Sequence, residues 1–111
     1  MGNEVHIAKV DDGVAVWNQW RIDNPGIQPN LTRADLSRRD LSGIDFRGVG
    51  LFQANLTGTT LTDANLRQAR LVSTKFTDAN LSGVHVFGTS VWDVDLTNAT
   101  QRDLVITPPG A

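Results

Sequence analysis

Apolar residues recur at every fifth position of this chain from residue 31 to residue 96. These positions hold Leu31, Leu36, Leu41, Phe46, Leu51, Leu56, Leu61, Leu66, Leu71, Phe76, Leu81, Val86, Val91 and Leu96. A period of five fits neither an amphipathic helix, which repeats about every 3.6 residues, nor an extended strand, which repeats about every 2. The chain must therefore turn once in every five residues.

A second pattern lies two residues before each of these central positions, where most residues are small or β-branched. They are Ala34, Ile44, Val49, Ala54, Thr59, Ala64, Ala69, Thr74, Ala79, Val84, Thr89 and Val94, with Arg39 as the exception. Both sets point inward if five residues form one side of a square coil and four sides close it. Stacking at the strand spacing of about 4.8 Å gives about 3.5 coils and a column about 17 Å tall. We expect an all-β solenoid.

Four stretches of this column carry the same short motif. They are Ala34-Asp35-Leu36-Ser37-Arg38, Ala54-Asn55-Leu56-Thr57-Gly58, Ala64-Asn65-Leu66 and Ala79-Asn80-Leu81-Ser82-Gly83. The motif resembles the A-(D/N)-L-x-x signature of the pentapeptide-repeat family, and the resemblance covers nearly two thirds of the chain. It implies a right-handed quadrilateral parallel β-helix, and it implies that no enzyme activity resides in the repeats.

The flanks should protect the ends of the column, where a solenoid exposes apolar side chains and unpaired backbone. The predicted segments are an N-terminal strand and helix cap (1–28), the β-helix (29–100) and a C-terminal strand or tail (101–111). Within the first segment, the alternation of Val5, His6 and Ile7 predicts a short strand over residues 4–10.

A helix should follow this strand and lie across the first coil. Asp11 or Asp12 can cap its N-terminus, and we expect it to run to about Arg21, before Asn24-Pro25-Gly26 ends it. The residues expected to cover the coil are Val14, Trp17 and Trp20. The segment Trp17-Asn18-Gln19-Trp20-Arg21 also resembles leaders found before other bacterial pentapeptide repeats.

The C-terminal end shows no helix of this kind. Gln101 occupies the next central position, so that the apolar period ends after Leu96. We expect Leu104 to Ile106 to form a last strand and Pro108-Pro109-Gly110 to leave the body as a tail. This end of the column is a candidate contact for a partner or a second copy.

Composition and charge narrow the function classes. The chain has no Cys, and His6 and His85 lie in different segments, so neither a metal site nor another cofactor site is expected. A net charge of -2 gives no reason to expect nucleic acid or a membrane as a partner. The first ten residues resemble neither a signal peptide nor a membrane span, and this predicts a cytoplasmic protein. No nucleophile or acid-base constellation is present, so we expect no enzyme activity.

Outward residues 20 positions apart should lie above one another and form vertical rows. One row is apolar and contains Phe52, Val72 and Trp92. The corner beside it should contain Arg47, Arg67, Phe87 and Arg70. Aromatic and Arg residues often dominate binding energy, which makes these residues the candidate partner-binding surface. Alternatively, the chain's own residues 5–10 or 104–106 fold back and cover the apolar row.

Two functions from different classes remain. The preferred one is a non-catalytic module that binds a protein partner or another copy through this surface or through its C-terminal coil. The alternative is a duplex mimic that inhibits or protects a topoisomerase, as some pentapeptide-repeat proteins resemble DNA. Residues 31–100 contain seven acidic residues (Asp35, Asp40, Asp45, Asp63, Asp78, Asp93, Asp95) and seven basic ones (Arg33, Arg38, Arg39, Arg47, Arg67, Arg70, Lys75). This neutral, short column disfavours the alternative.

Overall fold

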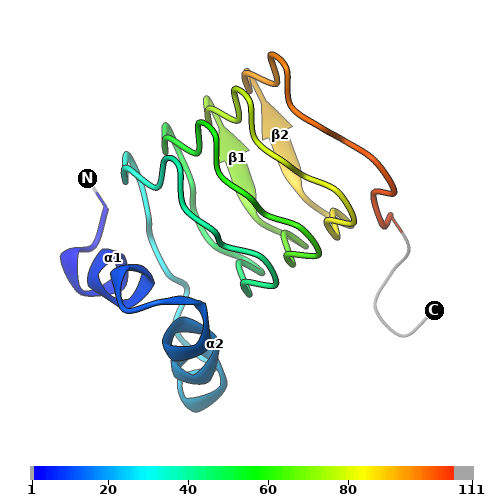
Figure 1. The fold of residues 1–111 in the computed structure, drawn as a ribbon. Helices are drawn as coiled ribbons and strands as arrows, with labels where there is room; N and C mark the ends of the chain where they lie inside the picture. Colours follow the sequence, from blue (N-terminus) through cyan, green and yellow to red (C-terminus); the bar gives the residue numbers. More distant parts are fainter. Residues whose placement is uncertain (1, 107–111) are drawn as a thin grey trace.

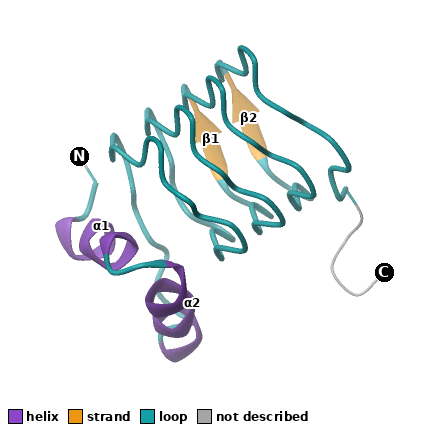
Figure 2. Ribbon diagram, viewed as in Figure 1, coloured by secondary structure: helices purple, strands orange, loops and turns teal. Residues whose placement is uncertain are grey.

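A computed structural model describes residues 2–106 as two short helices at one end of a column of stacked coils (Figure 1). The regular elements are α1 (Glu4–Asp11), α2 (Val14–Asp23), β1 (Arg70–Val72) and β2 (Ser90–Trp92). Most of the column is loop and turn (Figure 2), because each side changes direction before a longer strand can form. None of the helices among residues 2–106 has the length and apolar composition needed to cross a membrane.

Parallel backbone pairing with an offset of 20 residues holds the coils together. Asn30 pairs with Gly50, Gly50 pairs with Arg70, and β1 continues the same row by pairing with β2. The same offset recurs on the other three sides of the column, so the predicted coil of four five-residue sides is confirmed. The pairing reaches Val105, which lies opposite His85 and exchanges backbone hydrogen bonds with Val84 and Val86, and it therefore extends past the last apolar repeat.

The central residues form a buried ladder along most of the column. Every central position from Leu31 to Leu81 is at most 7% exposed. Burial then decreases, and Val91 is 57% exposed. Polar inward residues are satisfied locally: the buried hydroxyl of Thr59 donates to the carbonyl of Leu36 at 2.6 Å, and that of Thr74 donates to Leu51 at 2.7 Å. The core therefore carries polar groups without leaving their hydrogen bonds unmade.

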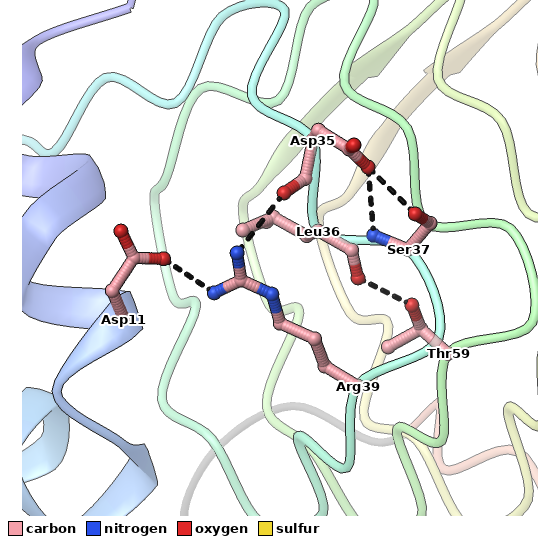
Figure 3. A network of polar contacts seen from close by, with 6 residues as sticks. All are labelled: Asp11, Asp35, Leu36, Ser37, Arg39 and Thr59. Atoms are coloured by element: carbon pink, nitrogen blue, oxygen red, sulfur yellow. Dashed lines mark hydrogen bonds and ion pairs between the residues drawn. The ribbon is translucent and has the colours of Figure 1, made fainter.

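Where an Asp or Asn stands directly before a central position, its side chain fixes the turn that follows. The carboxylate of Asp35 accepts the backbone N–H of Ser37 at 3.1 Å and its hydroxyl at 2.7 Å (Figure 3). Asn55 makes the same pair of bonds with Thr57. The hydrogen bonds from Ser37 lower the pKa of Asp35 because they favour its charged form. Asp and Asn thus have one structural role in the repeat.

The first segment is a helix, so the predicted strand over residues 4–10 is wrong. The side chain of Asn3 caps α1 by accepting the N–H groups of Val5 and His6 at 2.9 and 3.2 Å. Its partly buried Ile7 and buried Val10 lie three residues apart and face the first coil. The short alternation of apolar and polar residues was too brief to distinguish the two periods.

The predicted second helix is present, with different ends. It begins at Val14, and its N-cap is Gly13, which has no side chain to make a capping bond. Neither Asp11 nor Asp12 is therefore its N-cap. Asp12 instead ends α1. The helix continues to Asp23, and Asn24 is its C-cap, ahead of the predicted Pro-Gly stop.

Side chains of α2 make the hydrogen bonds to the first coil that the backbone of a preceding coil would otherwise make. Trp17 donates from its indole nitrogen to the carbonyl of Asp45 at 2.7 Å, and Asn18 accepts the N–H of Asp45 at 2.8 Å. Arg21 donates to the carbonyl of Arg47 at 2.7 Å. Elsewhere in the column these backbone groups bond to the neighbouring coil. The cap therefore satisfies part of the open backbone edge as well as covering the apolar core.

Residues of the first helix and the segment before it do the same for the backbone of Asn30, on a neighbouring side of the coil. The N–H of Asn3 donates to the carbonyl of Asn30 at 2.9 Å, and Nδ1 of His6 accepts the N–H of Asn30 at 3.0 Å. Burial lowers the pKa of His6 and so favours the neutral ring that can accept this bond. Arg39 pairs with Asp11 at 2.6 Å and donates to the carbonyl of Asp35 at 3.3 Å (Figure 3). Arg39, the exception in the inward pattern, thus serves the cap.

Trp17 is the central side chain of this cap. It is fully buried and meets Phe46 of the first coil edge to face, with ring centroids 5.5 Å apart. Trp20 and Val14, the other predicted capping residues, are partly buried against the same core. At the opposite end, residues 104–106 contribute a single bridge at Val105 rather than a strand, and the predicted tail at 108–110 lies outside the described residues.

Replacement of Trp17 should weaken the whole column. We expect Trp17→Ala to lower the free energy of unfolding by about 3 to 5 kcal/mol, because it leaves a cavity and removes the bond to Asp45. Val16→Ala, on the exposed side of the same helix, should change it by less than about 0.5 kcal/mol. Urea denaturation followed by circular dichroism measures both, and an unchanged midpoint for Trp17→Ala would contradict a supporting role for the cap.

Acid should destabilise the column through its turn carboxylates. The folded-state pKa values of Asp35, Asp40 and Asp95 are lowered, first by hydrogen bonds from the side chains of Ser37, Ser42 and Thr97. Their contribution to stability is therefore present above the unfolded pKa of about 3.9 and is lost as the pH falls through the folded values.

A triple variant tests this assignment. We expect Asp35→Asn, Asp40→Asn and Asp95→Asn together to keep the fold, because Asn makes the same turn at Asn55. Its urea midpoint should fall less steeply with acid than that of the wild type. Parallel acid profiles for the two proteins would show that other groups control the pH dependence.

Candidate functional site

The predicted apolar row is present on the face that contains β1 and β2. Val72 lies opposite Trp92 in the register of these strands, and the backbone bond from Gln53 to Val72 places Phe52 in the coil before them. Phe52 is 40% exposed, Val72 is half-buried and Trp92 is 74% exposed. We call these three residues the apolar stripe. Its side chains project from paired backbone, so their spacing is fixed by the coils.

Neither of the two segments considered as covers lies on the stripe within residues 2–106. Residues 5–10 belong to α1 and pack against the N-terminal end of the column, where Val10 is buried. Val105 pairs with the backbone beside His85, on a different side of the coil from β2, and Ile106 is 71% exposed. The stripe is therefore open to solvent in the described part of the chain.

The predicted corner of Arg and aromatic residues is only partly presented to solvent. Arg47 and Phe87 are exposed in one row, but Arg67 between them is half-buried and its guanidinium lies 2.8 Å from Nδ1 of His85. Arg70 lies on the stripe's own face, where its guanidinium extends over the backbone of Gly50. The four residues are thus divided between two sides of the column.

A polar groove beside the stripe was missed by the sequence reasoning. Its volume is about 510 Å³, and its lining includes the corner row Arg33, Gln53, Ser73 and Asp93. Nε of Arg33 donates to Gln53 at 2.6 Å, and the hydroxyl of Ser73 donates to Asp93 at 3.1 Å. The row is positive at its N-terminal end and negative at its C-terminal end. Reading the outward residues at an offset of 20 could have found it, because each follows a residue of the stripe's row.

The C-terminal end of the core is an apolar hollow of about 230 Å³. Leu71 and Phe76 form part of its floor, and Val91 and Leu104 lie at its more exposed margin. Over residues 2–106 no helix covers this end in the way that α1 and α2 cover the other (Figure 1). We call it the terminal hollow, and it is the second candidate contact surface.

The potential ligands for chemistry are dispersed. Across residues 2–106 there is no group of three or more His, Cys, Asp or Glu side chains placed to hold a metal ion. His6 accepts a backbone bond in the cap, whereas His85 contacts Arg67 on the column. The turn carboxylates, such as that of Asp40, bond to the next hydroxyl and N–H along the chain. These arrangements have structural uses.

The comparison with family models agrees with the five-residue geometry. The model for pentapeptide repeats, in 8 copies, matches residues 30–68 and 51–89. The chain belongs to the pentapeptide-repeat family. A search of curated protein sequences found no significant match.

Solved structures of other pentapeptide repeat proteins are similar to this one. One is a protein of the Arabidopsis thaliana thylakoid lumen, with 30% sequence identity, a TM-score of 0.69, and coverage of 72% of this chain and 55% of that one. Another is Rfr23 of the cyanobacterium Cyanothece 51142, with 28% identity, a TM-score of 0.56, and coverage of 70% and 56%. This pentapeptide-repeat chain thus spans little more than half of each relative. The similarity implies a right-handed β-helix.

Exposure of the stripe can be measured through Trp92. Trp17 is fully buried and Trp20 is half-buried, so Trp92 should provide most of the emission that acrylamide quenches. We expect Trp92→Phe to remove this component at low protein concentration, and Trp17→Phe, the control, to retain it. Equal quenching of Trp92→Phe and the wild type would mean that the stripe is covered.

Proposed function

We propose that this chain is a non-catalytic module that binds proteins through the apolar stripe and its neighbouring charged residues. The observation that supports the proposal most directly is the 74% exposure of Trp92 beside Val72 and Phe52. A single exposed apolar residue is ordinary on a protein surface, but two exposed aromatic residues with the half-buried Val72 between them form a continuous contact strip. Such a strip, with a large aromatic side chain, has the composition of an interface centre.

Rigidity favours this use of the stripe. The backbone of Val72 is bonded to the coils on both sides of it, since its carbonyl accepts from Gln53 and its strand pairs with β2. A partner would therefore not have to order the backbone on binding, which lowers the entropic cost of association. The side chains of Phe52 and Trp92 contribute area with few rotatable bonds.

The non-catalytic part of the proposal rests on how the polar groups are used. Inward hydroxyls such as that of Thr59 bond to carbonyls, and turn carboxylates such as that of Asp35 bond to adjacent Ser and Thr residues. A coil number of about 3.5 is supported by the offset of 20 between paired residues and stays a prediction, as does a cytoplasmic location.

Topoisomerase control by duplex mimicry is the weaker proposal. A mimic needs a run of negative charge, but Asp93 shares its corner row with Arg33, and Lys75 lies next to Asp95 in its row. The apolar stripe is also unlike a phosphate backbone. These features favour a protein contact of mixed apolar and charged character.

Affinity capture with a matched pair of variants tests the proposed function. The wild-type protein, Trp92→Asp and Ile22→Asp would be used as baits, and bound proteins, including untagged copies of the chain, would be quantified. Ile22 is the control because it is 70% exposed on α2, away from the stripe. We expect at least one protein to bind the wild type and Ile22→Asp but to be lost with Trp92→Asp. Binding that is indifferent to Trp92→Asp would exclude the stripe as the contact.

A further inference from the structure

We propose that the partner of the apolar stripe is a second copy of this chain, packed face to face and antiparallel along the column. The inference rests on the proposed function, since it assigns an occupant to the same surface. It is carried by two neighbouring rows on this face, which are self-complementary in charge and in side-chain size. The arrangement is a two-fold dimer, in which one patch contacts itself.

Charge is the first argument. The corner row runs Arg33, Gln53, Ser73, Asp93, and the charged groups at its ends bond to neutral neighbours, Arg33 to Gln53 and Asp93 to Ser73. Three coil spacings of about 4.8 Å separate Arg33 from Asp93, so they lie about 14 Å apart and do not pair within one molecule. An antiparallel copy brings Arg33 opposite Asp93 of the second copy, twice by symmetry.

Size is the second argument. The stripe's own row begins one coil earlier at Thr32, because the bond from Arg33 to Phe52 places these coils in register. With the two-fold axis between the levels of Phe52 and Val72, the large Trp92 opposes the small Thr32 of the second copy. Phe52 then opposes Val72. Large against small in both pairs is the complementarity that lets two faces approach closely.

Both arguments select the same axis and the same direction. A two-fold axis that lies in the interface and perpendicular to the column reverses the order of the coils. It keeps the corner row on the same side of the face. The row of Arg33 therefore meets itself in reverse. A parallel dimer, with its axis along the column, would move this row opposite Asn30, Gly50, Arg70 and Ser90, which contain no acidic partner for Arg33. Charge complementarity thus favours the antiparallel arrangement.

The dimer should be weak. The face is only about 17 Å tall, so the surface area that it can bury is smaller than that of a standard interface and typical of transient contacts. Arg70 adds a cost, because its guanidinium extends over Gly50 and both copies of it lie near the proposed axis. We therefore expect association that depends on concentration, with monomers at low micromolar protein and dimers approaching the millimolar range.

Sedimentation velocity across this range, with charge-swapped variants, tests the proposal. Arg33→Asp alone and Asp93→Arg alone should each weaken dimerisation about tenfold, because like charges would then face each other. The double variant should restore it to within about threefold of the wild type. Arg38→Asp is the matched control: Arg38 is exposed at the next corner, with φ 57 against 60 for Arg33, and its reversal should leave the dimer unchanged.

Two further variants separate the stripe from the terminal hollow. Phe52→Lys, two coils away from the C-terminal end, should abolish the dimer, and Leu104→Asp in the hollow should retain it. The opposite result would overturn the proposal in favour of end-to-end docking. A wild type that stays monomeric throughout would also overturn it, yet loss of another captured protein with Trp92→Asp would still support the proposed function. If the wild type stays monomeric and Trp92→Asp loses no captured protein, the stripe is excluded as a contact surface both for a second copy and for another protein.

Discussion

Backbone pairing between residues 20 positions apart is the constraint on which the rest of this structure depends. Each side of a coil contributes few pairs, and among residues 2–106 only β1 and β2 are long enough to be strands, so no single side would be stable alone. Stability comes from repetition, because each inner coil bonds to the one before and the one after it. The same repetition fixes the outward side chains in vertical rows. The charge and apolar character of each face are therefore set by the residues that share a row.

The two ends show what this dependence requires. At the N-terminal end, side chains of Trp17, Asn18, Arg21 and His6 meet backbone groups that coil neighbours would otherwise meet. Apolar cover alone would leave those donors and acceptors buried without partners, at a cost of about 1 to 3 kcal/mol each. At the other end, the exposed Val91 marks the terminal hollow. Within residues 2–106, the N-terminal end of the core is thus capped, whereas its C-terminal end is more exposed.

Much of the fold could be predicted because the period is a property of the sequence itself. The central residues from Leu31 to Leu81 are buried as expected, and the offset of 20 placed Val72 correctly beside Trp92. The N-terminal segment could not be predicted in this way, since three alternating residues are compatible with both periods. The capping bond of Asn3 resolves the choice, and it depends on geometry outside the alternation.

The candidate site was predictable in position but not in exposure. Whether Trp92 is open depends on the path of segments far from it in sequence, which no local pattern specifies. Sequence reasoning also treated Arg67 as a presented charge, whereas His85 holds its guanidinium against the column. The polar row of Arg33 was missed because the outward residues were sorted for aromatic and Arg content rather than for opposite charges at the two ends.

The separation between core and rows has a consequence for how such a protein acquires partners. Substituting an outward residue leaves the inward ladder untouched, so a face can change its chemistry at little cost in stability. A row with opposite charges at its two ends is then the simplest pattern that can recognise its own copy, since reversal converts it into its complement. A uniformly apolar face would associate in any register. The charged corner beside the apolar stripe reinforces the direction that the alternation of large and small side chains in the stripe's row also favours.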